Sequence, residues 1–194
     1  MVDLNRDPGG VALYPGADNT ELCPTRTFAD QAIYGDAGVP DAHEIAARRS
    51  EYFVPYHALL AGEVERVRAA NGHVIVLDGH SIRSEVPRFF AGRLPDLNLG
   101  TADGASCAPA VQAAAGVVLA GAATFTSVVN GRFRGGYVTR HYGRPLHNVH
   151  ALQLEIAQAC YMDESPPFPW DAARAAPLVA VLQRLVAALL ELRP

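Results

Sequence analysis

The segment that most constrains the fold is the short apolar run at residues 74–77, Val-Ile-Val-Leu, which leads into Asp78, Gly79 and His80. A run this short, rich in β-branched residues and bounded by turn formers, predicts a buried central strand. A long helical pattern over residues 41–72 precedes it directly. Strands that alternate with helices in this way predict an α/β fold, with helices covering a mostly parallel sheet.

The helical pattern before this strand carries its own start and stop signals. Asp41 is the expected N-cap residue, and Glu44 lies at the position that completes a capping box. Gly72 follows the last periodic residue and marks the end of the helix. Pro55 lies inside the pattern, so we expect it to kink or divide this helix.

The rest of the chain divides into loops, short strands and two further helices. We expect loops over residues 1–40 and 85–109, because both are rich in Gly, Pro and Asp. The other segments are assigned from periodicity and composition: a weakly determined helix over 110–123, a strand within 125–133, a strand or hairpin edge over 135–143, a strand from 150, and a helix over 171–192. Residues 1–194 are too few for two large cores, so we expect a single domain.

Charge and composition exclude several classes of protein. The formal net charge of −4 disfavours nucleic acid as a partner. Charged or small residues break the apolar runs, and the first residues lack a basic region followed by an apolar block, so we expect no membrane span, no secretory signal and a cytoplasmic location. Cys23, Cys107 and Cys160 are widely spaced, which argues against disulfides and cysteine zinc sites.

Two polar positions lie where strands of α/β sheets present ligand sites. His80 follows the apolar run and is a candidate zinc ligand that Asp78 would orient, although a satisfied histidine at a strand end has the same pattern. Glu155 lies in an otherwise apolar strand. If this glutamate is buried, its pKa rises towards neutrality and it becomes a candidate general base; the alternative is an exposed strand face.

Arginine is the only cation available for anion binding, since all 16 basic residues are Arg. Asn5 and Arg6 are adjacent, and an arginine fork beside an amide suits a carboxylate. A second group lies in "GRFRGGYVTRHYGRP", where Arg132, Arg134, Arg140 and Arg144 predict either an anion-binding loop or a solvated one. The nearby histidines 141, 147 and 150 form a further candidate metal site, although their spacing fits no compact zinc pattern.

Five blocks, taken together and in order, resemble the N-formylglutamate amidohydrolase (N-formylglutamate deformylase) family: "VDLNRDP", "LDGHSIRS", "GRLPDLNLGTADGASC", "NGRFRGGYVTRHYGRP" and "VHALQLEIAQACYMDE". The resemblance implies a zinc-dependent hydrolase that splits N-formyl-L-glutamate, or a similar N-acyl amino acid, into formate and L-glutamate in histidine degradation. It also implies a three-layer α/β/α fold with a mostly parallel or mixed sheet, like that of zinc carboxypeptidases and aspartoacylases.

The resemblance also assigns roles to individual residues. By similarity, His80 would bind zinc, or another divalent metal, and Glu155 would be the general base that takes a proton from the zinc-bound water. Asn5 and Arg6 would hold one substrate carboxylate. Arg83 and Arg140 would hold the other carboxylate.

One departure from the family pattern changes these expectations. Family members carry a leading segment with a proline-histidine-small-residue-glycine motif and an Asp-Trp-His neighbourhood, and residues 1–40 match neither. The domain over residues 1–194 is therefore expected to be N-terminally incomplete, with one recognisable zinc ligand and an unpaired sheet edge. A homo-oligomer could cover that edge. The alternative function is a non-catalytic relative that binds a small carboxylate without turnover.

Overall fold

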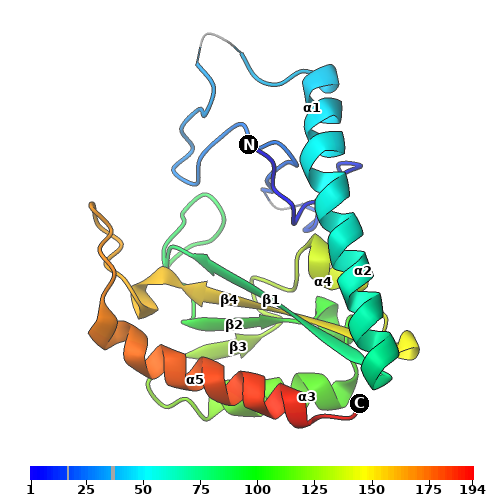
Figure 1. Ribbon diagram of the computed structural model, residues 1–194. Coiled ribbons are helices and arrows are strands. Elements are labelled where there is room, and N and C mark those ends of the chain that lie inside the picture. Colours follow the sequence, from blue (N-terminus) through cyan, green and yellow to red (C-terminus); the bar gives the residue numbers. More distant parts are fainter. Residues whose placement is uncertain (17, 36–37) are drawn as a thin grey trace.

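The computed structural model describes residues 1–16, 18–35 and 38–194 (Figure 1). Within this part of the chain, four strands form one sheet in the order β1-β4-β2-β3. The strands are β1 (Val74–Ile82), β2 (Leu97–Gly100), β3 (Ser127–Val129) and β4 (Val149–Ala157). β1 runs parallel to β4, β2 runs parallel to β3, and β2 runs antiparallel to β4. The sheet is therefore mixed, one of the two arrangements expected from the sequence.

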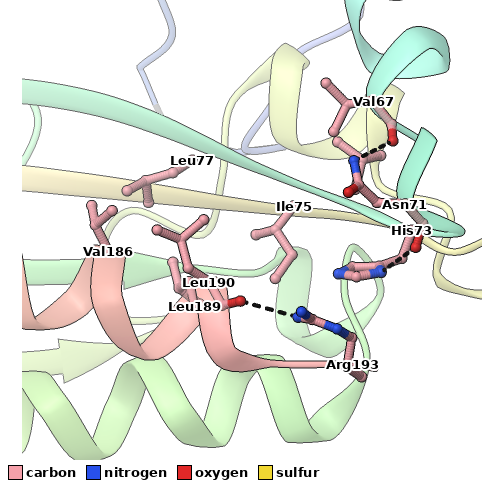
Figure 2. A pocket seen from close by; sticks show the side chains of 10 residues that line it. Val67, Asn71, His73, Ile75, Leu77, Val186, Leu189, Leu190 and Arg193 are labelled. Atoms are coloured by element: carbon pink, nitrogen blue, oxygen red, sulfur yellow. Dashed lines mark hydrogen bonds between the residues drawn. The ribbon is translucent and has the colours of Figure 1, made fainter. Parts of the chain in front are cut away.

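The prediction that residues 74–80 form a buried central strand was wrong in position. β1 is an edge strand among the described residues, and most of its interior side chains are only partly buried. The central strand is β4, in which every residue except Ile156 is buried. The apolar run was misread because Ile75 and Leu77 lie at the margin of the main core, where they pack against it but stay only partly buried. Between β1 and α5 lies an apolar groove of about 430 Å³ that contains Ile75, Leu77 and Leu190 (Figure 2).

The long helical segment begins and ends as predicted. α1 (Ala42–Arg48) starts at Asp41, whose side chain accepts a hydrogen bond from the Glu44 backbone N–H. A π-helical turn (Arg49–Phe53) then separates α1 from α2 (Val54–Asn71), with Pro55 in the first turn of α2. Pro55 thus divides the helix, since it has no N–H to continue the regular ladder. Gly72 ends α2 in the left-handed region, with φ of 78°.

Helices lie on both sides of the sheet (Figure 1). α3 (Pro109–Ala120) and α5 (Ala172–Glu191) cover one face, whereas α4 (Tyr137–Tyr142) and the end of α2 approach the other face near β1. Among the described residues, three short 3₁₀ turns complete the regular structure: Ala102–Gly104, Pro145–His147 and Gln158–Cys160. This arrangement confirms the predicted α/β class with helices flanking the sheet.

Two local predictions differ from the structure. Residues 135–143, expected as a strand or hairpin edge, contain helix α4 instead. The prediction failed because the side chain that caps this short helix, Asn5, comes from a distant segment. Residues 85–109, expected as loop, contain strand β2, which is only four residues long but wholly buried. The helices at 110–123 and 171–192 and the strand at 125–133 are confirmed as α3, α5 and β3.

The main core lies between the sheet and the helices α3 and α5. β2 and β4 contribute leucines 97, 99, 152 and 154, and α5 contributes Leu178, Val181, Leu185 and Leu189. On length and composition alone α5 could also cross a membrane, which the sequence analysis did not expect. This signal is weak, because core helices of folded proteins meet the same criterion and α5 packs one face into this core. Cys23, Cys107 and Cys160 are buried and free.

Leu185 tests how much this core contributes to stability. Its side chain is fully buried in the core cluster. We expect Leu185→Ala to lower the free energy of unfolding by about 3 kcal/mol, because truncation removes buried methyl groups and leaves a cavity. Urea unfolding followed by circular dichroism measures the loss. Val179→Ala, at an exposed position of the same helix, is the control and should change stability by less than about 1 kcal/mol.

Candidate functional site

The sheet places His80 and Glu155 side by side. β1 and β4 are parallel neighbours, and their register pairs His80 with Glu155 and Asp78 with Gln153. Residues at paired positions of neighbouring strands point to the same face, and the carboxyl ends of parallel strands lie at the same edge. All four side chains therefore gather on one face of the sheet, near the ends of β1 and β4.

The imidazole of His80 lies between two polar side chains. Its Nε2 atom is 2.8 Å from Oδ1 of Asp78 and 2.9 Å from Nδ2 of Asn5. The hydrogen bond to Asp78 raises the pKa of His80 above its usual value, and the charges of Asp78 and Glu155 act in the same direction. Asp78 therefore orients the ring, as the sequence suggested, and stabilises its protonated form.

Asn5 connects the N-terminal segment to this strand end and to α4. Its Nδ2 atom donates to Oδ2 of Asp78 at 2.8 Å, and its Oδ1 atom accepts from the Val138 backbone N–H at 2.7 Å. Val138 lies in the first turn of α4, so Asn5 satisfies one of the N–H groups that the helix leaves unpaired there. Gly136 permits this approach: a Cβ atom at that position would come within 2.6 Å of the Asn5 side chain.

Glu155 is buried in the site and keeps one amide partner. The residue is 7% exposed, which excludes the exposed-face alternative. Gln153 Nε2 donates to Oε2 of Glu155 at 3.2 Å, and Gln153 Oε1 accepts from the Gly136 N–H at 2.6 Å. Burial raises the pKa of Glu155 to about 7, against the opposing effect of the His80 charge. A carboxyl group with this pKa can take up and release a proton near neutral pH.

A cavity of about 170 Å³ opens beside this carboxyl group. Its walls include His80, Glu155, Arg6 and Tyr14. The Arg6 guanidinium is fixed at the wall, with Nε donating to Oγ1 of Thr20 at 2.6 Å and Nη2 lying 3.4 Å from a carboxylate oxygen of Asp3. A second, larger cavity of about 560 Å³ also reaches Asp78, His80 and Asn5. His80 therefore faces two cavities.

The described residues supply only part of a metal site. His80 and Asp78 are donors of the kind that zinc binds, whereas catalytic zinc takes about three protein ligands. No group of three His, Cys, Asp or Glu side chains within the described ranges is placed to hold a metal ion. This holds for the histidines 141, 147 and 150 as well: His150 is buried and its Nδ1 accepts from the Ala108 N–H.

The structure gathers four of the six site residues expected from sequence. Asn5, Arg6, His80 and Glu155 line the 170 Å³ cavity. Arg140 lines an adjoining cavity of about 370 Å³. Arg83 is exposed, contacts the Glu164 carbonyl oxygen at 3.3 Å and is not among the residues that line either cavity.

Sequence reasoning missed two residues of the site. Gln153 lies two positions before Glu155 on the same strand face, so the alternation of β4 could have identified it as a neighbour of the carboxyl group. Tyr14 lines the cavity from the N-terminal loop. No local pattern in the sequence indicated its role, because its position depends on contacts with residues far along the chain.

Comparison with known proteins identifies relatives over almost the whole chain. The family model described as N-formylglutamate amidohydrolase matches residues 1–162. An N-formylglutamate deformylase of Pseudomonas aeruginosa is 46% identical over 190 residues, which are 98% of this chain and 71% of that protein. An N-formylglutamate deformylase of Pseudomonas putida is 42% identical over the same shares of the two chains.

Solved structures agree on the fold. The crystal structure of an N-formylglutamate amidohydrolase from Ralstonia eutropha JMP134 superposes with a TM-score of 0.76 and 26% identity, covering 97% of this chain and 72% of that one. A protein from Agrobacterium tumefaciens superposes with a TM-score of 0.65 and 20% identity, covering 97% of this chain and 66% of that one, and it supports the fold alone.

Proposed function

The chain belongs to the N-formylglutamate amidohydrolase family, and we propose that it hydrolyses N-formyl-L-glutamate to formate and L-glutamate in the cytoplasm, as a step of histidine degradation. Two relatives that carry the name N-formylglutamate deformylase support the substrate. The structural observation that carries the proposal is the buried Glu155 carboxyl, which lies beside His80 at the wall of a cavity.

Glu155 is the proposed general base and acid of this reaction. Its carboxylate removes a proton from the attacking water, whose oxygen forms the new bond to the formyl carbon. The same carboxyl group then delivers the proton to the nitrogen as the C–N bond breaks, so formate and the free amine leave. A pKa of about 7 suits both transfers near neutral pH. Gln153 holds the carboxyl group through its amide N–H and so fixes the direction of transfer.

Zinc, or another divalent metal, is the proposed cofactor. When bound, zinc supplies a more acidic water and polarises the oxygen of the scissile carbonyl. His80 is its proposed ligand, with Asp78 as the carboxylate that orients the imidazole or joins the ligand set. The described residues provide no third ligand in place, so we assign His80 a part of the site rather than the whole of it.

The proposed substrate contacts follow the positions of the arginines. Arg6 is held at the wall of the 170 Å³ cavity, where it would bind a substrate carboxylate. Asn5 reaches the same wall, but its side-chain amide already bonds Asp78 and the α4 backbone, so we propose that it positions the site. Arg140 is proposed for the second carboxylate. Arg83 would need to move from its exposed place beside Glu164 to contribute.

Formate release tests the proposal directly. With zinc supplied, the full chain should release formate from N-formyl-L-glutamate, and chelation should remove most of the activity. His80→Gln should lower both zinc retained after gel filtration, measured by mass spectrometry, and turnover by at least about 10-fold, the usual scale for loss of a metal-site group. His73→Gln, at an exposed histidine before β1, is the control. Equal zinc content in His80→Gln and the unaltered chain would remove His80 from the metal site.

The second candidate function is binding of a small carboxylate without turnover. The absence of a third ligand side chain near His80, within the described ranges, is the observation that favours it. Under this alternative, calorimetry would detect binding of N-formyl-L-glutamate by the folded chain, and no formate would appear with or without zinc.

A further inference from the structure

A further cavity, of about 370 Å³, adjoins the candidate site and is lined in part by three arginines. Arg132, Arg134 and Arg140 form its walls together with Asp103. Leu13 and Tyr14 line both this cavity and the 170 Å³ cavity that contains Glu155. The two cavities therefore share part of their walls, and the arginines lie on the neighbouring side of Tyr14 from the space that contains Glu155.

Arg132 and Arg140 share the Tyr14 ring. The central guanidinium carbon of Arg132 is 5.2 Å from the ring centroid, and that of Arg140 is 5.7 Å away. The ring itself is fixed at both ends. Its hydroxyl accepts a hydrogen bond from the Arg134 backbone N–H, and the Tyr14 backbone exchanges two hydrogen bonds with the Asn19 side chain. The fixed ring therefore attracts both guanidinium groups and helps to hold each of them beside it.

Each of these guanidinium groups is oriented through Nε alone. Arg140 Nε donates to the Gly135 carbonyl oxygen at 2.9 Å, and Arg132 Nε donates to the Phe89 carbonyl oxygen at 3.1 Å. Among the described residues, neither arginine forms an ion pair with a carboxylate, whereas Arg134 pairs with Asp103 at 3.3 Å. The Nη edges of Arg132 and Arg140 are thus left to bind an anion, in the forked geometry that suits a carboxylate.

We propose that Arg132 and Arg140, on the platform of Tyr14, form the subsite for the distal carboxylate of an acidic N-acyl amino acid. This inference rests on the proposed function, which places the scissile amide beside Glu155. Arg6 takes the carboxylate nearest the amide, and the Tyr14 subsite takes the one at the end of the side chain. The subsite selects a ligand whose side chain ends in a carboxylate over one of equal length that ends in a neutral group. Arg132 and Tyr14 are then residues that determine substrate specificity.

Binding of two matched ligands tests this subsite without requiring turnover. N-formyl-L-glutamate and N-formyl-L-glutamine differ only in the charge of the distal group, and calorimetry gives the Kd of each. The unaltered chain should prefer the glutamate compound by about 100-fold, the scale of two charge-assisted hydrogen-bonding groups. Arg132→Gln and Arg140→Gln should each reduce the preference by about 10-fold, and the double variant should bind both ligands about equally.

Three further variants separate charge, ring and fold. Arg132→Lys keeps the charge but loses the fork, so it should retain part of the preference. Tyr14→Leu should reduce the preference by removing the platform, although it touches neither ligand charge. Arg144→Gln alters an exposed arginine outside the cavity and should leave the preference unchanged. Thermal unfolding of every variant identifies any that fail to fold.

The outcomes distinguish this inference from the proposed function. A preference that depends on Arg132 and Arg140 in a chain that releases no formate would support the subsite and contradict the hydrolase. Turnover in a chain whose two arginine variants keep the full preference for glutamate would support the hydrolase and overturn the subsite. Equal or absent binding of both ligands by the unaltered chain would also overturn it.

Discussion

Glu155→Gln should lower kcat for formate release from N-formyl-L-glutamate by about 1000-fold or more, within the range for loss of a general acid–base group. Gln has nearly the shape of Glu and can still accept the Gln153 amide hydrogen bond that Glu155 accepts. It cannot take a proton from water. The Kd for the substrate should therefore change little, and single-turnover measurements with calorimetry separate the two effects.

The pH dependence of the unaltered chain provides an independent check. The base must be deprotonated, so kcat/KM should fall as the pH drops through about 7, the pKa of Glu155. The Gln variant should show no such limb in its residual activity. An acidic limb that persists unchanged in the Gln variant would mean that Glu155 is not the titrating base.

The same substitution should stabilise the metal-free fold at alkaline pH. The pKa of Glu155 is raised from 4.5 to about 7 in the folded chain, so the folded state binds this proton more tightly than the unfolded state does. The stabilisation is complete below pH 4.5 and is lost as the pH rises through 7, by about 3 kcal/mol in total. Glu155→Gln should remove this loss, and urea unfolding at pH 5 and pH 8 measures it. Gln183→Leu, at an exposed position of α5, is the control and should leave the pH dependence of stability unchanged. Gln153→Leu does not serve as a control, because it removes a contact with Glu155.

Local patterns in the sequence predicted the elements whose causes are local. The capping side chain of Asp41, the break at Pro55 and the stop at Gly72 all act within a few residues, and the structure confirms each. The candidate base was also identifiable from sequence. A glutamate between aliphatic residues of one strand either is buried, with a raised pKa, or lies on an exposed face of the strand. Burial of Glu155 resolves that choice.

Contacts between distant segments could not be predicted in this way. Among the described residues, β1 pairs with one strand only, β4, which is the last strand in the sequence. That pairing places β1 at the edge of the sheet. Nothing in "VIVLDGH" encodes which strand pairs with it. The arginine cluster presents the same difficulty: the spacing suggested four equivalent cations, and only the position of Tyr14, more than a hundred residues earlier, separates Arg132 and Arg140 from Arg134.

Asn5→Leu should damage both the fold and the site, because the side chain of Asn5 joins three separate parts of the chain. It is buried and bonds Asp78 in β1 and the backbone of Val138 in α4. Leu has a similar volume but leaves the Val138 N–H and one Asp78 oxygen without partners. Each buried group that loses its partner costs about 1–3 kcal/mol, so we expect unfolding to become easier by about 3 kcal/mol.

The effect on the site should exceed the effect on stability alone. Asp78 orients His80, and Asn5 both bonds Asp78 and lies within 2.9 Å of the same imidazole, so loss of the amide weakens the support of both side chains. We expect turnover by the folded fraction to fall by about 100-fold, the scale for loss of an outer partner of a metal-ligating histidine. Urea unfolding and formate release, measured at a temperature where the variant is folded, separate the two losses.

Asn5→Asp is the matched comparison, since it keeps the acceptor for the Val138 N–H and replaces only the donor to Asp78. Two carboxylates would then face each other, and one would hold a proton at neutral pH. This variant should keep α4 in place and lose stability as the pH rises, whereas the Leu variant should be destabilised equally at pH 5 and pH 8. If both variants kept the stability and turnover of the unaltered chain, the hydrogen bonds of Asn5 would not be what holds the N-terminal segment to the sheet. The position of His80 would then depend on Asp78 alone.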